Sequence, residues 1–310
     1  MPSELTDHKT TVRSIAIGPW AIPPHAYFIV SAVFHYLGPS FAVLLFARVD
    51  VLGVAWMRIA SAALIFAAWR RPWRRFFSLR RKGQVLIIAL GAVFAVMNAC
   101  FYLAISRLPL ATVAAIEFIG PILLAAIGVR TRRNFTAIIA AATGVYLLTH
   151  ARLVAEPIGL AFAFANAGLF TAYIVLAHRV SREQSMGGID GLAAAMMFAF
   201  VFVSPIGLTG AARAFGDPIA LAAGVGVGVT SSVIPYVTDQ LAMARLPRAT
   251  YALFVALLPA TAAVIGAIVL RQIPSVVDLA GISAVMLGVA LHQDRSTATG
   301  AETTIQVDRV

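Results

Sequence analysis

The chain has 310 residues, of which 60% are hydrophobic and only 12% are charged, and its mean hydropathy is +0.89. This composition excludes a soluble domain, whose surface needs more polar residues, and it indicates a polytopic membrane protein. The net charge of +11 would suggest nucleic acid in a soluble protein, but no nucleic-acid motif accompanies it, so we expect no nucleic-acid partner.

Residues 1–26 are predicted to form a polar tail without a removable signal peptide, because they lack an apolar core followed by a cleavage site. Ten apolar runs follow, most of them long enough to cross a hydrocarbon core of roughly 30 Å. Continuous runs favour α-helices over the alternating strands of a β-barrel. The runs lie at about 27–46, 51–69, 84–106, 108–129, 135–149, 157–177, 189–212, 218–238, 249–270 and 273–293.

The first run contains His35 and a Gly38-Pro39 pair. A proline inside a helix frees a backbone carbonyl that lipid cannot satisfy, so this point should break the helix and face protein or water. His35 is therefore a candidate lining residue, and a neutral histidine bonded to a neighbouring helix is the alternative.

Two opposite charges lie at similar depths in the second and fourth runs. At a rise of 1.5 Å per residue, Arg58 is about 10 Å and Glu117 about 12 Å from the outer end of its run. A charge within the membrane is costly unless it is paired or hydrated. We therefore predict that Arg58 and Glu117 pair and that at least one of them acts on substrate or in coupling. The alternatives are that Arg58 snorkels outward to the membrane surface or that the pair is only structural.

Further polar residues lie at comparable depths. Asn98 and Asn166 suggest a polar layer, although amide hydrogen bonds between helices would explain them equally well. Tyr173 is predicted to line a cavity. Tyr102 and Tyr236 lie near span ends, where aromatic belts occur.

One segment occurs twice. An offset of 138 residues lays 102–121 over 240–259 with nine identities in twenty positions, including a shared Arg-Leu-Pro-x-Ala-Thr turn. Pro121 and Pro259 coincide in this alignment near the middle of their runs. With Gly120, they are predicted to be the paired points at which these helices break.

The repeat defines the predicted organisation. Two tails, 1–26 and 294–310, flank repeats at 27–150 and 151–293. Five spans per repeat is an odd number, so the second repeat must enter the membrane inverted. The expected fold is all-α, with ten transmembrane helices in two inverted five-helix repeats. This arrangement is typical of transporters with a substrate site near the bilayer midplane.

The basic residues predict the orientation. With the N-terminus inside, the inner segments hold eighteen of the 24 Lys and Arg residues and the outer turns hold five, as the positive-inside rule requires. Both termini are thus expected in the cytoplasm. The basic segment from Arg70 to Lys82, interleaved with aromatics, is expected to meet anionic lipid headgroups.

Several segments resemble the EamA family of the drug/metabolite transporter superfamily, most of all its threonine/homoserine exporter branch. They are WMRIA around Arg58, RRPWRR, YLAISRLP, the Glu117-Phe-x-Gly-Pro121 stretch, SSVIPY and LAMARLPRAT. The resemblance covers nearly the whole chain. It implies a bundle in the bacterial inner membrane that exports amino acids or related metabolites, without a cofactor.

This chain departs from that pattern at two positions. Leu258 replaces a glutamate that often precedes the second-half proline, and Arg271 lies where an acidic residue is frequent. The fold tolerates both changes, but the substrate does not carry over, because specificity depends on the cavity lining.

Other functions remain as alternatives. A transporter of phosphorylated sugars or nucleotide-sugars could use Arg58 for an anion. A membrane enzyme is disfavoured, because the chain has no HExxH motif and its thirteen acidic residues are scattered, so we expect neither catalytic residues nor a metal. A non-transporting scaffold is a further alternative. The oligomeric state, including a homodimer, is left open.

The predicted topology can be tested by cysteine accessibility in intact cells. A cysteine introduced at Arg74 should react with membrane-impermeant reagents only after the cytoplasmic side is exposed. Labelling of that position from outside would contradict the orientation.

Overall fold

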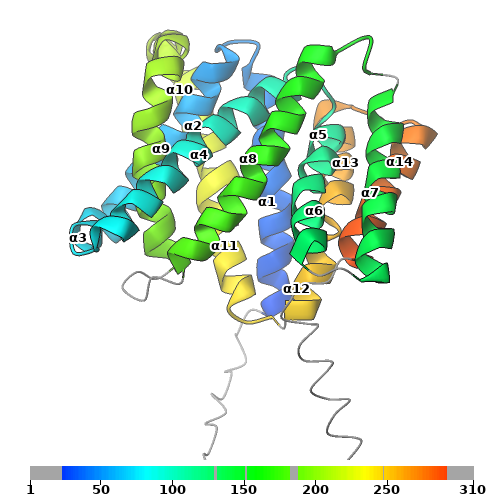
Figure 1. Ribbon diagram of the computed structural model, residues 1–310. Coiled ribbons are helices and arrows are strands. Elements are labelled where there is room, and N and C mark those ends of the chain that lie inside the picture. The colour runs from blue at the N-terminus through cyan, green and yellow to red at the C-terminus, as the bar shows by residue number, and fades with distance from the viewer. Residues whose placement is uncertain (1–22, 129–130, 151, 182–187, 247, 292–310) are drawn as a thin grey trace, which may run out of the picture.

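The computed structural model describes residues 23–128, 131–150, 152–181, 188–246 and 248–291, and every regular element in these ranges is a helix (Figure 1). In the first half these are α1 (Pro24–Leu45), α2 (Val51–Arg70), α3 (Trp73–Phe76), α4 (Arg81–Ile105), α5 (Leu110–Glu117), α6 (Ile119–Gly128) and α7 (Arg132–His150). In the second half they are α8 (Pro157–Ser181), α9 (Gly188–Ala211), the 3₁₀ turn η1 (Ala212–Gly216), α10 (Pro218–Gly228), the π-helical turn η2 (Val229–Val233), α11 (Ile234–Met243), α12 (Arg248–Val255), α13 (Leu258–Leu270) and α14 (Val276–Leu291).

The helices are apolar enough for a membrane. Within the described residues, six helical segments are long and apolar enough to cross one, and shorter apolar helices at Leu110–Leu124, Leu258–Leu270 and Val276–Leu291 accompany them. The six are Pro24–Leu45, Val51–Arg70, Arg81–Ile105, Pro157–Val180, Gly188–Gly216 and Pro218–Met243. The chain is therefore a multi-pass membrane protein.

Helices of the two halves of the chain pack against each other throughout the bundle. α1 lies in the middle of the bundle and contacts α10, η2, α11 and α13 of the second half (Figure 1). α4 packs against α8 and α9, α2 against α9, and α7 against α14. α1, α4 and α12 begin at the end drawn lowest in Figure 1, which we call the lower end; the turns at 46–50 and 212–217 lie at the upper end.

Two helices are broken, at corresponding points. Pro121 and Pro259 have no N–H to donate four residues back, which frees the carbonyls of Glu117 and Val255. α5 ends at Glu117 and α6 begins at Ile119, while α12 ends at Val255 and α13 begins at Leu258. Each break thus precedes its proline, because α5 and α12 end at the residue whose carbonyl has lost its N–H partner. Pro121 and Gly120 themselves lie inside α6, which corrects the position predicted from sequence.

The prediction of a break at Gly38-Pro39 was wrong. α1 continues from Pro24 to Leu45 with Pro39 inside it. Gly38 and Pro39 are both buried, so this point does face protein, as expected. A Cβ on Gly38 would lie 2.2 Å from Oγ and 2.6 Å from N of Ser231, so the glycine is needed for α1 to approach η2 this closely.

The helix bounds otherwise follow the apolar runs closely. α1 starts at Pro24, three residues before the predicted run, and the run at 218–238 contains the π-helical turn that hydropathy did not reveal. The predicted C-terminal tail, 294–310, and residues 1–22 of the N-terminal tail lie outside the described residues.

An ion cluster ties the lower ends of α2 and α9 together. Asp190 is buried, and both Arg70 and Arg75 donate to its carboxylate, Arg70 from Nε at 2.7 Å. Both arginines are partly exposed, so the cluster positions the basic segment that follows α2.

Asp190→Asn should lower the free energy of unfolding in detergent by about 1.5–3 kcal/mol, the usual contribution of hydrogen bonds to a charged group. The matched control is Asp217→Asn, because Asp217 pairs with the exposed Arg48 at the upper end and should contribute less. Equal losses of unfolding free energy in the two variants would show that burial of the Asp190 cluster adds nothing to stability.

Candidate functional site

Arg58 lies at the centre of the bundle and is 5% exposed. Its Nε donates to Oγ of Ser232 at 3.0 Å, and its Nη2 donates to the carbonyl of Ser231 at 3.1 Å. Its guanidinium carbon lies 5.5 Å from the ring centroid of Tyr102, a distance suited to a cation–π contact. A guanidinium has five N–H groups, so three remain beyond these two bonds, and the Tyr102 hydroxyl lies close to them.

The local sequence explains why Arg58 is held here. Pro235 cannot donate to the carbonyl of Ser231, four residues earlier, and the helix there widens into the π-helical turn η2. In an apolar bundle a freed carbonyl needs another donor, and Arg58 supplies it across the interface between the halves. The carbonyl of Pro235 is itself bonded by the Ser31 hydroxyl at 3.1 Å.

Arg58 and Glu117 do not form the direct ion pair that the sequence suggested. Glu117, 7% exposed, ends α5 at the first helix break. Its carboxylate interacts with Arg58 only at longer range, and its nearest polar neighbour is the fully buried amide of Asn166 on α8. The pairing failed as a prediction because equal depth places two residues in one layer without placing them side by side.

The other predicted residues are only partly brought together. His35 on α1 is half-buried, stacks edge-on against Tyr36 and lies within electrostatic range of Arg58. Tyr173 on α8 belongs to an aromatic group, with its ring 5.9 Å from that of Phe94. Asn98 is buried, but its amide donates to the carbonyl of Phe94 on its own helix at 2.8 Å. Asn98 is thus a helix-stabilising residue in this conformation.

Sequence reasoning placed Tyr102 and Tyr236 at the membrane interfaces, and the structure contradicts this. Tyr102 is completely buried beside Arg58. Tyr236 packs on Phe94, with centroids 5.8 Å apart, and lies within electrostatic range of both Arg58 and Glu117. Both rings lie on the side of their helix that faces the centre, which position along the chain does not reveal.

Ser231 and Ser232 were also missed. The signal was present in SSVIPY, because a proline four residues after Ser231 frees a carbonyl that some donor must satisfy.

The second half of the site depends on Gly120. A Cβ at this position would lie 1.8 Å from Oγ1 of Thr171 and 2.8 Å from the carbonyl of Ala167. The glycine therefore allows α6 to contact α8 next to Asn166, just past the break at Glu117. Pro259, at the corresponding break, is buried at the start of α13.

The polar atoms at this centre are incompletely satisfied. Among the described residues, four buried side-chain atoms have no hydrogen bond of normal geometry: Oη of Tyr102, Oγ of Ser231, and Nδ2 and Oδ1 of Asn166. The Tyr102 hydroxyl reaches Arg58 and Ser231 only loosely, and Asn166 reaches Glu117 in the same way. Buried polar groups without well-formed bonds are rare in folded proteins, which makes this centre the candidate functional site.

Access to this centre differs between the two ends. The upper segment before the first break, residues 110–118, is buried at every position. Its counterpart in the repeat, α12 at the lower end, has half-buried side chains at Thr250, Tyr251, Phe254 and Val255. Residues 169–177 of α8 are half-buried at every position, so no side of that segment is fully packed. The upper segment is thus more tightly packed than the described part of its lower counterpart.

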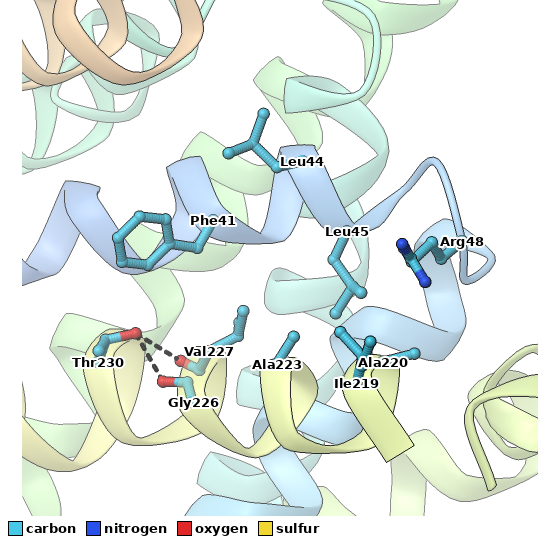
Figure 2. Close-up of a pocket in the computed structure, with 10 residues that line it drawn as sticks. All are labelled: Phe41, Leu44, Leu45, Arg48, Ile219, Ala220, Ala223, Gly226, Val227 and Thr230. Atoms are coloured by element: carbon cyan, nitrogen blue, oxygen red, sulfur yellow. Dashed lines mark hydrogen bonds between the residues drawn. The ribbon is translucent and has the colours of Figure 1, made fainter. Parts of the chain in front are cut away.

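A separate groove of about 430 Å³ lies between α1 and α10 (Figure 2). Its lining is apolar except for Thr230 and Arg48. Thr230 donates to the carbonyls of Gly226 and Val227 on its own helix, and Arg48 is paired with Asp217. None of the candidate residues lines this groove, so its chemistry favours apolar contact over solute binding.

A double-mutant cycle can test the contacts of Arg58. Arg58→Ala and Ser232→Ala should show a coupling free energy of about 1.5–3 kcal/mol in unfolding, as expected for a hydrogen bond to a charged group. Coupling between Arg58→Ala and Glu117→Gln should be smaller. Ser204→Ala is the matched control, because Ser204 bonds Trp56 instead and should be additive with Arg58→Ala. Recovery of stability in an Arg58→Glu, Glu117→Arg double mutant would contradict this geometry.

Comparison with known proteins identifies the family. The model of the EamA-like transporter family matches residues 157–292. The threonine/homoserine exporter RhtA of Escherichia coli (strain K12) is 30% identical over 260 residues, covering 80% of this chain and 84% of that protein. RhtA of Salmonella typhimurium (strain LT2) is 30% identical over 258 residues, with the same coverage.

A solved crystal structure of another protein is similar in fold, with a TM-score of 0.56 at 15% identity, covering 86% of this chain and 96% of that one. At this identity the likeness concerns the fold alone. The relatives and the family model are those of transporters and not of enzymes. The chain belongs to the EamA-like transporter family.

Proposed function

We propose that this protein exports small amino acids, such as threonine or homoserine, from the cytoplasm by alternating access. The observation that carries the proposal is the group of unpartnered polar atoms around Arg58 and Glu117, at the interface of the two halves. The spare N–H groups of Arg58 suit a solute carboxylate. Tyr102, Ser231 and Asn166 offer hydrogen bonds to the rest of a small polar solute. The similarity to RhtA supports this class of substrate.

The proposed architecture is ten membrane-spanning segments in two inverted repeats. If each helix of one half is replaced by its counterpart in the other half, observed helix contacts become other observed contacts. The counterparts are α1 and α8, α2 and α9, α4 and α10–α11, α5–α6 and α12–α13, and α7 and α14. The pair α1 and α11 becomes α8 and α4, and α1 and α13 becomes α8 and α6. The pairs α2 and α9, and α7 and α14, map onto themselves. This exchange supports the repeat independently of the sequence match.

The proposed location is the bacterial inner membrane, with both termini in the cytoplasm. The lower end would then face the cytoplasm, and it carries the basic segment that contains α3, suited to anionic headgroups. The described conformation, closed above and looser below, would be the state that receives solute from inside. Rocking of one repeat against the other around Arg58 would expose the same centre to the outside.

We further propose that Glu117 couples export to protons. It ends the broken helix α5 beside Asn166, and in the repeat its counterpart is Val255, so only the first of the two broken helices ends in a titratable group. A solute that draws Arg58 toward itself would change the charge balance at Glu117 and favour a change in its protonation.

The test uses uptake of labelled threonine into inside-out vesicles. Wild-type vesicles should accumulate threonine in a protein-dependent manner that responds to an imposed pH gradient. Glu117→Gln keeps the shape but cannot titrate, so it should equilibrate threonine without uphill accumulation. A variant that still accumulates threonine with unchanged pH dependence would exclude the coupling role. Inhibition by phosphate esters in place of amino acids would instead favour a sugar-phosphate substrate.

A further inference from the structure

Asp239 is a carboxylate inside the bundle, and no arginine or lysine side chain that the structure describes pairs with it. It is half-buried in α11, in the lower half of the bundle. Elsewhere among the described residues, the carboxylates of Asp190, Asp217, Asp278 and Glu156 each pair with an arginine, and Glu117 has Arg58 within electrostatic range. Asp50 also lacks an arginine, but it caps α2 at the upper surface. A carboxylate left without a cation in an apolar bundle favours a cationic ligand.

Among the described side chains, the groups next to Asp239 are neutral. The hydroxyl of Tyr251 on α12 donates to its Oδ1 at 2.7 Å, and Ser31 on α1 is a second hydroxyl neighbour. Tyr173 and Tyr236 lie within electrostatic range. A carboxylate with tyrosines nearby suits an ammonium group, which can pair with the charge and pack against an aromatic ring.

The position also relates Asp239 to Arg58. Ser232, Tyr236 and Asp239 are spaced by four and three residues, so they follow one face of the η2–α11 helix. Seven residues at 1.5 Å put Asp239 roughly 10 Å below Ser232, the partner of Arg58. An amino acid is too short to span that distance between its ammonium and carboxylate groups. Asp239 is thus placed about two helical turns from the partner of Arg58, as a position separate from the polar centre.

The corresponding positions of the first repeat do not carry this pair of a carboxylate and a tyrosine hydroxyl. At the offset of 138 residues Asp239 coincides with Phe101 and Tyr251 with Val113, both buried apolar residues of the closed upper end. At these positions the upper end is thus apolar, whereas the lower end carries a carboxylate.

We propose that Asp239, with Tyr251 and the aromatic rings of Tyr173 and Tyr236, forms a separate subsite at the lower end that binds the primary ammonium group of the solute before it reaches Arg58. Two parts of this proposal rest on the proposed function: that solute enters from the lower end, and that the ligands are amino acids. The preference of the subsite for an ammonium group is independent of that function, because it follows from the unpaired carboxylate. Tyr251 releases Asp239 when α12 moves, which ties occupancy of the subsite to the helix that ends at the second break.

The experiment exploits the single cysteine of the chain, Cys100. In a Cys100→Ala background, Tyr251→Cys places a thiol beside Asp239. The labelling rate is measured in inside-out vesicles with aminoethyl methanethiosulfonate, a primary ammonium, and with its anionic sulfonatoethyl analogue. The ratio of the two rates should fall about tenfold when Asp239→Asn is added. Asp239→Glu, which keeps the charge, should retain the ratio, and the distant Asp217→Asn is the matched control that should leave it unchanged.

A rate ratio that is the same with Asp239→Asn as without it would overturn the subsite, whatever the protein transports. In the Asp239 protein, threonine methyl ester and threonine should both slow labelling by the cation, whereas N-acetylthreonine, which has no ammonium group, should not. Protection by N-acetylthreonine equal to that by threonine would also overturn the proposal. A charge-dependent ratio with no protection by threonine would support the ammonium subsite and count against threonine as the substrate, so the two failures are distinguishable.

Discussion

The centre of this protein is organised by one constraint: the carbonyl of Ser231 needs a hydrogen-bond donor, and Arg58 provides it. An apolar bundle offers no water to a backbone group that loses its helical partner. Pro235 removes that partner, and the chain supplies a guanidinium from the other half. A structural need for a donor thereby brings a buried cation to the interface between the two halves of the chain, where we propose that a solute carboxylate uses its remaining N–H groups.

The same constraint recurs at the two broken helices. Pro121 and Pro259 free the carbonyls at the ends of α5 and α12, and the breaks fall at corresponding positions of the repeat. Their surroundings differ, however. The upper segment is closed by buried apolar residues and ends in Glu117, while α12 is looser and ties its Tyr251 to Asp239. The two broken helices thus occupy corresponding positions but carry different charged groups.

The sequence predicted the all-helical membrane fold, the family and most helix bounds, because hydropathy and proline placement act locally along the chain. It also selected Arg58 and Glu117, since a charge in an apolar run is conspicuous. It could not pair them correctly. One partner of Arg58 is the carbonyl of Ser231, 173 residues away; Pro235 marks that carbonyl as free, but the sequence does not show which donor reaches it. Tyr102 and Tyr236 were misplaced because depth along a helix does not reveal which side of it faces the centre.

The central claim is that the polar centre around Arg58 serves the export of small amino acids. The most direct measurement is an untargeted comparison of extracellular metabolites between cells that express the wild-type chain and cells that express Arg58→Ala at equal membrane abundance. The account predicts that one or a few small amino acids, threonine or homoserine among them, accumulate outside only with the wild-type chain. Equal extracellular amino-acid profiles for the two chains, with both present in the membrane, would contradict it.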